Sequence, residues 1–427
     1  MARILIPDPL DLPQLAALRG LGRRGHACDV AWSFSRRQDR YLGKHCLGRY
    51  CHQVHEIPDP SKSVEGYAEA VIDLCRSGIY DVVLPTRGLS LETLLPHRDA
   101  ISNSCATLMP TPAQFSLGID KFATFDLCRK LGVIHPETVF LSDESDIEAI
   151  ANRLGYPVVV KHRRNFGGSR GVMMVSDPAG LSAAVDDLAG LTDSRQDLML
   201  QKFLPGTIVD ACLVAKNGRI GGMVTQERRL MYPISGGVAC ILATVDLPEL
   251  EKLVVSIVET LDWTGPAQIE FKWDPLLRRF SLIEINPRFW ATTGAWLKAG
   301  ANFPALAVDL ALNREPPAFP RLPANLRFKY LIGRTPASLV QLWRSRGRRA
   351  LKDPRSYSRT WYDFDLGDPL PDLFRCFIEV RRALSGGYRL IDQTLAREFD
   401  PSFSRDDWAS REPEGGPDQQ EKAAVAL

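Results

Sequence analysis

Residues 280–288 have the sequence Phe280-Ser281-Leu282-Ile283-Glu284-Ile285-Asn286-Pro287-Arg288. The apolar residues predict a strand, and side chains in a strand repeat every two residues. Glu284, Asn286 and Arg288 therefore share one face, where two oxygen-bearing side chains and a guanidinium point the same way. Their apolar neighbours indicate burial, and buried charge needs a partner. This face is the first candidate for a binding site.

A second predicted strand, Ala267 to Trp273, carries Glu270 and precedes the first by a short turn. We expect the two strands to form a hairpin with Glu270 beside Glu284. Two carboxylates and the amide oxygen of Asn286 make a hard-oxygen site that Mg²⁺ accepts when substrate phosphates complete its shell. Arg288 is suited to hold a transferring phosphoryl group or a developing oxyanion. The alternative is that these are edge-strand charges in surface salt bridges.

A strand that ends in a lysine precedes a glycine-rich loop. The strand is Pro157-Val158-Val159-Val160-Lys161, and the loop spans residues 165–171 before another predicted strand at 172–175. Glycine allows backbone N–H groups to converge on phosphate oxygens, and lysine or arginine supplies charge. This layout predicts a loop folded over an anionic ligand.

Residues 1–112 alternate short apolar strands with helical patterns, which favours a doubly wound α/β unit with a mostly parallel sheet. Pro and Asp interrupt the opening apolar stretch, so we expect a first strand there and not a signal peptide. No G-x-G-x-x-G follows it, so a nicotinamide or flavin site is not predicted. The polar residues 405–427 predict a disordered tail. The basic stretch 327–352 is expected to be a solvated helix face, with an anion-binding or lid role as the alternative.

The composition is that of a globular protein with several domains. The 427 residues are 45% hydrophobic and 24% charged, with a formal net charge of +2. This balance gives no electrostatic reason to expect nucleic acid or an anionic membrane as a partner. No apolar run reaches the roughly 18 residues of a membrane-spanning helix. Nine scattered cysteines without a Cys-x-x-Cys spacing indicate neither a disulfide framework nor a zinc ribbon, so a reducing cytoplasm is the expected location.

Together these motifs resemble the ATP-grasp superfamily of carboxylate-amine ligases, from residue 1 to about residue 320. The resemblance implies mixed α/β and α+β architecture, with a Rossmann-like domain before a two-lobed ATP-grasp fold that holds ATP between its lobes. The expected divisions are a pre-ATP-grasp domain at 1–115, an N-terminal lobe at 116–200, a C-terminal lobe with the metal strands at 201–320, a variable C-terminal region at 321–404 and the tail at 405–427.

The resemblance also assigns residues. Asp120-Lys121 followed by Gly132-Val133-Ile134-His135-Pro136 matches a family pattern and makes Lys121 the first nucleotide-contacting lysine. Lys161 becomes the second lysine, on the α- and β-phosphates. The implied phosphate-covering loop contains Gly167, Gly168, Ser169 and Gly171. The implied adenine hinge contains Gln201, Lys202, Phe203 and Leu204. The implied metal ligands are Glu270, Glu284 and Asn286.

The hinge departs from the family pattern. Many relatives carry Glu where this chain has Lys202, and another acid just after the Pro-Gly turn to hold the ribose hydroxyls. Here residues 207–209 are Thr-Ile-Val, and Asp210 is the nearest acid. Asp210 is a candidate for the ribose, with solvent exposure as the alternative.

Residues 226–237 lie between the hinge and the metal strands and contain Arg228, Arg229, Gly236 and Gly237. A double arginine and a Gly-Gly pair suit a loop that binds an acidic substrate near the γ-phosphate. A surface hairpin explains the same pattern equally well.

The resemblance implies phosphoryl transfer followed by acyl transfer, with ATP and Mg²⁺, or Mn²⁺ in its place. Lys161 and Arg288 are the expected catalytic residues, and small carboxylates and amines the expected substrates. Two alternatives stay open. One is an acceptor that is not an amine, as in a carboxylase-like or carbamoyl-phosphate-like reaction. The other is a nucleotide-binding regulator without catalysis. A homodimer is a common arrangement among relatives.

Overall fold

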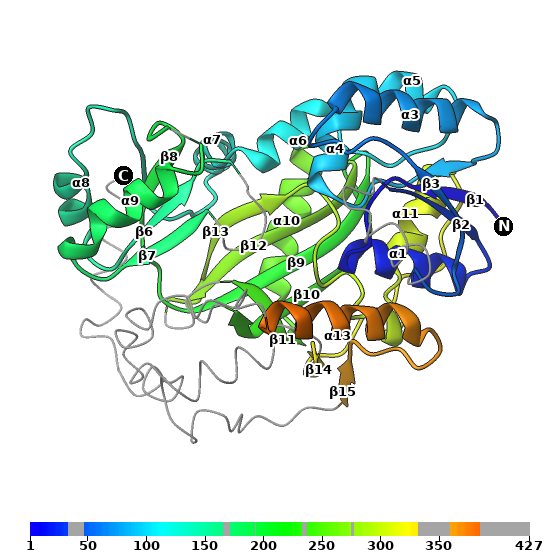
Figure 1. Cartoon of the computed structure of the whole chain (residues 1–427). Coiled ribbons are helices and arrows are strands. Elements are labelled where there is room, and N and C mark those ends of the chain that lie inside the picture. Colours follow the sequence, from blue (N-terminus) through cyan, green and yellow to red (C-terminus); the bar gives the residue numbers. More distant parts are fainter. Residues whose placement is uncertain are drawn as a thin grey trace.

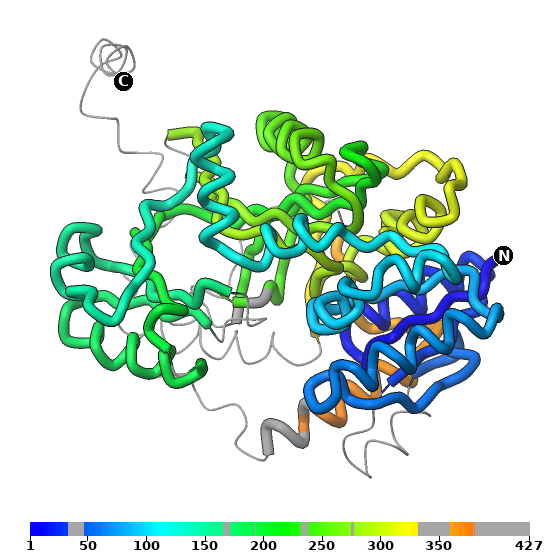
Figure 2. The backbone as a smooth tube through the Cα atoms, turned by 90° about the horizontal axis from the view of Figure 1, so that it is seen from above, coloured from blue at the N-terminus to red at the C-terminus, as the bar shows by residue number. Residues whose placement is uncertain are grey.

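The computed structural model describes residues 1–32, 47–164, 171–192, 194–232, 237–274, 277–331 and 359–384. Three sheets organise this part of the chain: a four-stranded sheet of the N-terminal domain, a four-stranded sheet of a small lobe, and a seven-stranded sheet between them (Figure 1). The view from above shows the N-terminal domain and the small lobe at opposite ends of the molecule (Figure 2).

The N-terminal sheet has the strand order β3-β2-β1-β4, and all its pairings are parallel, as the sequence predicted. Its strands are β1 (Arg3–Ile6), β2 (Ala27–Trp32), β3 (Cys51–Glu56) and β4 (Val82–Val83). Its helices are α1 (Leu12–Gly22), α3 (Val64–Arg76), α4 (Gly88–Leu94), η1 (Leu95–His97) and α5 (Arg98–Ser102). Because the strands are parallel, the segments after β1 and β4 meet at one edge of the sheet.

The small lobe is an antiparallel sheet of order β5-β8-β6-β7. Its strands are β5 (Thr138–Phe140), β6 (Val158–His162), β7 (Val172–Val175) and β8 (Leu198–Lys202). Its helices are α8 (Ile147–Leu154), η2 (Pro178–Gly180) and α9 (Leu181–Ala189). Two further helices, α6 (Pro112–Ile119) and α7 (Lys121–Leu131), connect this lobe to the N-terminal domain.

The seven-stranded sheet has the order β13-β12-β9-β10-β11-β14-β15. Its strands are β9 (Thr207–Lys216), β10 (Arg219–Tyr232), β11 (Val238–Thr244), β12 (Gly265–Asp274), β13 (Arg279–Asn286), β14 (Leu326–Lys329) and β15 (Arg359–Tyr362). The remaining helices are α10 (Pro248–Thr260), η3 (Leu297–Ala299), α11 (Phe303–Ala311) and α13 (Pro369–Leu384). β14 and β15 lie beyond the expected boundary at residue 320 and still extend this sheet.

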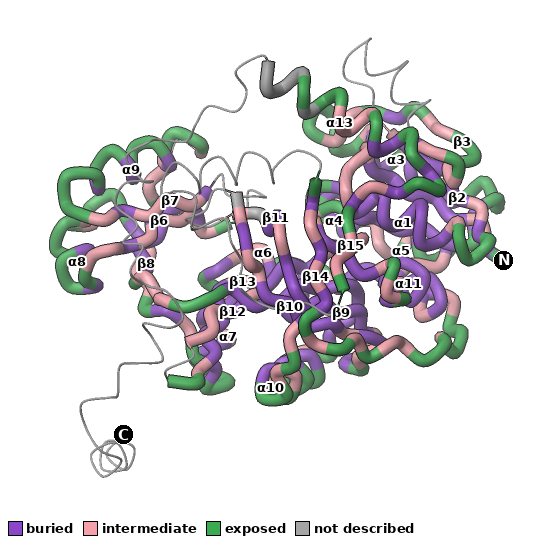
Figure 3. Tube along the Cα trace, turned by 90° about the horizontal axis from the view of Figure 1, so that it is seen from below, coloured by how far each residue is buried: buried purple, intermediate pink, exposed green. Residues whose placement is uncertain are grey.

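The two faces of the large sheet differ in what covers them. Val209, Ala211 and Leu213 of β9 belong to the same buried cluster as the apolar residues of α10. The residues between them, Asp210 and Cys212, point to the other face because successive side chains alternate. The burial colouring shows the sheet as mostly buried, and helices α8, α9 and α10 as exposed on their outer sides (Figure 3). The candidate site is on the face with Asp210, and Cys212 on the same face packs in the buried cluster that includes α11.

A buried ion-pair network connects α1 to the segment 363–375. Arg19 of α1 donates to Asp368 at 3.1 Å and to Asp372 at 2.9 Å, and its side chain is only 7% exposed. The other members of what we call the α1–α13 network are Arg23, Arg375, Asp363 and Asp365. Each charge in it has an opposite charge beside it, which is the condition for burying such groups.

Several sequence predictions lie outside the described residues: the tail at 405–427, most of the basic stretch 327–352, and the loop residues Gly167, Gly168 and Ser169, with Gly236. The eight cysteines within the described ranges are free. None of the helices that the structure describes is both long and apolar enough to span a membrane.

Candidate functional site

Acidic and amide side chains form a row across four strands of the large sheet. Glu284 of β13 lies directly opposite Glu270 of β12, which confirms the predicted hairpin register. Glu270 in turn lies opposite Asp210 of β9, and Asp210 opposite Gln226 of β10. Since residues in register point to the same face, the sheet gathers these groups on the side away from α10.

Glu270 is the centre of this row. Its Oε1 accepts hydrogen bonds from Asn286 Nδ2 at 3.0 Å and lies 2.6 Å from an Arg228 nitrogen. Burial raises the pKa of Glu270 to about 7; Arg228 opposes this effect, whereas the carboxylates of Asp210 and Glu284 add to it. The raised pKa of Glu270 therefore comes first from its burial and second from the two neighbouring carboxylates.

Two lysines face this row from the small-lobe side. Lys121 begins α7, its side chain is 4% exposed, and its Nζ lies 4.0 Å from Glu284 Oε2. Asp120, the N-cap of α7, binds Arg163 at the end of β6 through two hydrogen bonds of 2.8 and 2.7 Å. This pair fixes the start of α7 against β6, the strand that carries Lys161.

Lys161 has no ion-pair partner among the residues that the structure describes. Burial lowers its pKa to about 8, and nearby Lys121 lowers it further, while Glu284 and Glu270 act in the opposite direction. A cation with a depressed pKa and no anion of its own stabilises an incoming anion more than a solvated lysine does. The loop after it begins beyond Arg164, and within that loop only Gly171 is described; its carbonyl accepts from the backbone N–H of His162.

The predicted hinge connects β8 to β9. Gln201 is buried and donates to Thr138 Oγ1 at 2.9 Å, so its side chain faces the small-lobe sheet. Lys202 is exposed, and its backbone N–H donates to Glu137 O. Phe203 and Leu204 are half-buried, and the Phe203 ring lies beside Lys272 of β12.

Lys272 is a further cation on this face that we did not predict. It follows Glu270 by two positions in β12, donates to Gly206 O at 3.2 Å and lies 5.5 Å from the centroid of the Phe203 ring. Burial, Lys161 and Arg228 lower its pKa to about 8. The two-residue strand period that grouped Glu284 with Asn286 would also have grouped Lys272 with Glu270.

The proposed ribose ligand requires a correction. Asp210 lies inside β9 with an exposed fraction of 0%, not at the hinge surface. Arg228 binds both of its carboxylate oxygens, at 3.0 and 2.7 Å, and Gln226 donates a third hydrogen bond at 3.1 Å. Asp210 therefore supports the cation beside Glu270 and is not available to a ribose.

The predicted substrate loop also differs. Arg228 and Arg229 belong to strand β10, which forms a hairpin with β11, and only residues 233–236 between them lie outside the description. Arg228 reaches Glu270, whereas Arg229 pairs with Glu227 at 2.8 Å, and their side chains are only 6% and 10% exposed. The two arginines diverge because successive side chains of a strand point to opposite faces, and the register with β11 shifts between Arg228 and Leu230. Gly237 accepts a hydrogen bond from Arg228 at 3.4 Å.

Arg288 lies where β13 meets the N-terminal domain. It donates to Asn286 Oδ1 at 3.2 Å and to Phe289 O at 2.9 Å. Burial lowers the pKa of Arg288, and no carboxylate of the described residues lies within ion-pair distance of it. The start of α4 in the N-terminal domain lies close to it, because a Cβ added to Gly88 would lie 3.5 Å from Arg288 Cδ.

The donor set fits a hard divalent cation. Glu270 and Glu284 are adjacent carboxylates whose mutual repulsion is only partly compensated, and Asn286 contributes an amide beside them. Oxygen ligands of this kind suit Mg²⁺. The described part of the chain contains no cluster of three or more His, Cys, Asp or Glu side chains suited to a metal ion, so Asn286 would have to supply a ligand here.

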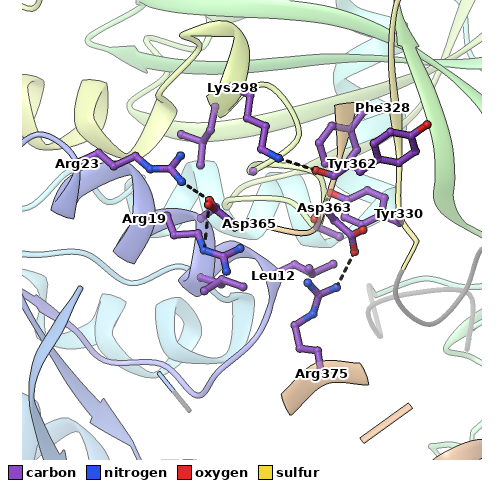
Figure 4. Close-up of a pocket in the computed structure, with 15 residues that line it drawn as sticks. Leu12, Arg19, Arg23, Lys298, Phe328, Tyr330, Tyr362, Asp363, Asp365 and Arg375 are labelled. Atoms are coloured by element: carbon purple, nitrogen blue, oxygen red, sulfur yellow. Dashed lines mark hydrogen bonds and ion pairs between the residues drawn. The ribbon is translucent and has the colours of Figure 1, made fainter. Parts of the chain in front are cut away.

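One cavity of the described chain lies away from this row. It has an empty volume of about 470 Å³, including its open mouth, and lies between α1, the segment 291–298, β14, β15 and α13. Figure 4 shows Arg19 and Arg23 directed at Asp365, and Arg375 directed at Asp363. Its arginines and aspartates are those of the α1–α13 network, and they are already paired with one another. Lys298, which also lines the cavity, donates to the backbone carbonyls of Tyr362 and Phe364.

The comparisons with known proteins indicate the class of protein: the chain is similar to members of the ATP-grasp superfamily. A family model described as "ATP-grasp in the biosynthetic pathway with Ter operon" matches residues 194–333. Biotin carboxylase from Campylobacter jejuni has a similar structure, with a TM-score of 0.60 at 17% identity over 76% of this chain and 74% of that one. L-amino acid ligase from Bacillus licheniformis aligns with a TM-score of 0.55 at 16% identity, over 73% of this chain and 74% of that one.

The proteins that are similar in sequence are matched over only part of their length. The arginine-specific large chain of carbamoyl phosphate synthase from Lactiplantibacillus plantarum is 23% identical over 60% of this chain and 27% of that protein. N5-carboxyaminoimidazole ribonucleotide synthase from Synechococcus elongatus is 26% identical over 41% of this chain and 44% of that protein. The chain thus spans between about a quarter and a half of these relatives.

Proposed function

We propose that the protein is an ATP-dependent ligase that activates a substrate carboxylate as an acyl phosphate and joins it to an amine. ADP and phosphate are the other products. The observation that carries the proposal is the pairing of Glu270 with Glu284, with Asn286 bonded to Glu270 and Lys121 within 4.0 Å of Glu284. A structural salt bridge would not require two adjacent carboxylates that face three lysines.

The residues divide the work of phosphoryl transfer, which is mainly positioning and charge stabilisation. Lys121 and Lys161 neutralise the ATP phosphates, and Lys161 suits this role because it has no anionic partner among the described residues. Glu270, Glu284 and Asn286 would hold Mg²⁺, which when bound screens phosphate charge. Arg228 keeps Glu270 oriented and limits its repulsion from Asp210.

Arg288 acts at the reacting group. A substrate carboxylate oxygen attacks the γ-phosphorus, the bond to the β-phosphate oxygen breaks, and ADP leaves. The guanidinium of Arg288 stabilises the charge that develops on the transferring group. An amine then attacks the acyl carbon, phosphate leaves with the C–O bond electrons, and the amine gives up one proton to form the amide.

Hydroxylamine trapping tests this proposal. The purified protein is incubated with ATP, Mg²⁺ and pooled amino acids and small carboxylates, with and without hydroxylamine, and ADP, phosphate and new masses are followed. Formation of ADP that depends on one carboxylate, together with its hydroxamate, would support the acyl-phosphate route. ADP formation without any trapped acyl group, across all pools, would contradict it.

A second candidate is a reaction with bicarbonate, as in a carboxylase-like or carbamoyl-phosphate-like enzyme. The names of the relatives favour it, because carbamoyl phosphate synthase and biotin carboxylase are among them. Bicarbonate-dependent ADP formation in the absence of any other carboxylate would favour this candidate. A catalytically silent nucleotide-binding regulator would bind ATP and form no ADP with either pool.

A further inference from the structure

The N-terminal domain places charged side chains directly opposite Arg288. β1 and β4 are parallel neighbours, and the segments that follow them, 7–11 and 84–88, meet at the edge of the sheet that faces β13. Arg87, at the N-cap position of α4, pairs through Nε with Asp11 Oδ2 at 3.2 Å. The Arg87 and Asp11 side chains are 43% and 31% exposed, so neither is sealed in the interior.

A buried carboxylate holds these two segments together. Asp8 is 0% exposed and accepts hydrogen bonds from Thr86 N at 2.5 Å, from Thr86 Oγ1 at 3.0 Å and from the Ser90 hydroxyl. Three donors from the segment 86–90 therefore attach it to the end of β1. Arg87 lies between two of the anchored residues, so its backbone has little freedom to move away from Arg288.

The two guanidiniums have few direct contacts with carboxylates. Arg288 donates to a carbonyl and an amide oxygen, and Arg87 pairs with Asp11, which also accepts from Gln14 N. In the described part of the chain, Asp11 is thus the one carboxylate within ion-pair distance of either guanidinium, while Glu284 and Glu270 act on Arg288 from farther away. A planar carboxylate fits such a pair, because guanidinium donors match its two oxygens.

From this arrangement we infer that Arg87 and Arg288 together bind the carboxylate that is to be phosphorylated, and that Arg87 determines which carboxylates are accepted. The inference rests on the proposed function. It adds a residue of the N-terminal domain to a site otherwise built from the two lobes, and it assigns Asp8 as the positioning residue that holds Arg87 in place. The ligand class is a small organic carboxylate.

The kinetic test compares Arg87→Gln and Arg87→Lys with Arg24→Gln. Arg24 is a matched control, since its side chain is 40% exposed and pairs with Asp309 at 3.4 Å at the other end of α1. Loss of one charge-assisted hydrogen bond is worth about 10- to 100-fold in affinity. We expect KM for the carboxylate to rise by that factor in Arg87→Gln and less in Arg87→Lys.

The other kinetic constants serve as controls. We expect kcat and KM for ATP to stay within about threefold of wild type in the Arg87 variants, and Arg24→Gln to behave as wild type. An unchanged carboxylate KM in Arg87→Gln, in a protein with a wild-type unfolding midpoint, would overturn the inference.

A labelling experiment separates failure of the inference from failure of the ligase proposal. Phenylglyoxal modifies accessible arginines, and peptide mass spectrometry reports the extent at Arg87, Arg288 and Arg24 without any turnover. We expect the pooled carboxylates, in the presence of ADP and Mg²⁺, to slow labelling of Arg87 and Arg288 but not of Arg24. If carboxylates slow the labelling of Arg87 and Arg288 but no ADP is formed, the carboxylate site is supported and the ligase proposal is rejected. If ADP is formed but the labelling of the two arginines is unchanged, the ligase proposal is supported and the carboxylate site is rejected.

Discussion

The carboxylate row around Glu270 and the α1–α13 network are both clusters of acids and bases, and they differ in charge balance. In the network, each arginine has an aspartate within ion-pair distance, and Asp372 is fully buried between Arg19 and Arg375. In the row, Lys161 and Arg288 lack such partners among the described residues, and Glu270 has a pKa near 7. The network pairs its charges within the protein, whereas the row contains cations that have no ion-pair partner in the described chain. This difference in pairing distinguishes the proposed site from the cavity, which belongs to the network.

The largest effect is expected from a change in the row. Glu284→Gln keeps the size of the side chain but removes the charge that faces Lys121, and we expect turnover to fall by about 10³-fold or more. Steady-state ADP formation measures it. The unfolding midpoint should stay close to that of wild type, since the Glu284 side chain is 24% exposed and its contact with Lys121 is long, at 4.0 Å. Turnover within tenfold of wild type would show that the row is not the reaction centre.

The opposite pattern is expected from the network. Asp372→Ala leaves Arg19 and Arg375 without a shared carboxylate in the interior, and breaking a buried pair in this way costs about 3–5 kcal/mol of stability. Urea unfolding measures the loss. ADP formation per folded molecule should be unchanged, and a large fall in kcat without loss of stability would contradict the division between the two regions.

Mg²⁺ affinity should depend on pH through Glu270. Its pKa in the folded protein is about 7, above its ordinary value of 4.5, so the native state binds the proton more tightly than the unfolded chain. The metal-free protein therefore loses stability as pH rises from about 4.5 to 7, and the loss is constant above that. Mg²⁺ must displace this proton, so its affinity should fall about tenfold per pH unit below 7. Calorimetry with ADP present between pH 5.5 and 8.5 measures it. If the Mg²⁺ affinity of Glu270→Gln still falls below pH 7, the proton that Mg²⁺ displaces belongs to another group.

The smallest effect is expected at the mouth of the cavity. Arg23 pairs with Asp365, but its side chain is 36% exposed and Asp365 also lies 3.8 Å from Arg19. Arg23→Gln should cost no more than about 1 kcal/mol, with turnover unchanged. Urea unfolding at low and high salt measures it, and the difference from wild type should shrink at high salt. A loss of stability as large as that of Asp372→Ala would mean that the Arg23–Asp365 pair at the mouth of the cavity stabilises the fold as much as the buried pairs of Asp372 do.

The sequence alone predicted the parts of the site that lie close together in the chain. The strand period grouped Glu284, Asn286 and Arg288, and the short turn placed Glu270 beside Glu284, because hairpin register depends on local residues. Arg228 and Asp210 were misplaced for a physical reason. Which strand lies next to β12 is decided by packing of the whole sheet, and no local pattern shows that β9 brings Asp210 into the row.

No sequence pattern predicted that the N-terminal domain would contribute Arg87 to the proposed site. Arg87 and Arg288 are about two hundred positions apart, and their approach depends on the docking of α4 against the large sheet. Arg87 is a single arginine among many in the chain, and neither its spacing nor its neighbours distinguish it. Charges that pair over such separations become visible only when the domains are placed relative to one another.

The bond between Arg19 and Asp372 spans 353 positions of the chain. At synthesis rates of roughly 5 to 20 residues per second, about 20 to 70 s pass between the appearance of the two residues at the ribosome. During that interval α1 can form, but its arginine has to stay hydrated, because burial without a counter-ion is costly. The first helix of the protein therefore reaches its final environment only after almost the whole described chain has been made, and the N-terminal domain is completed last although it is synthesised first.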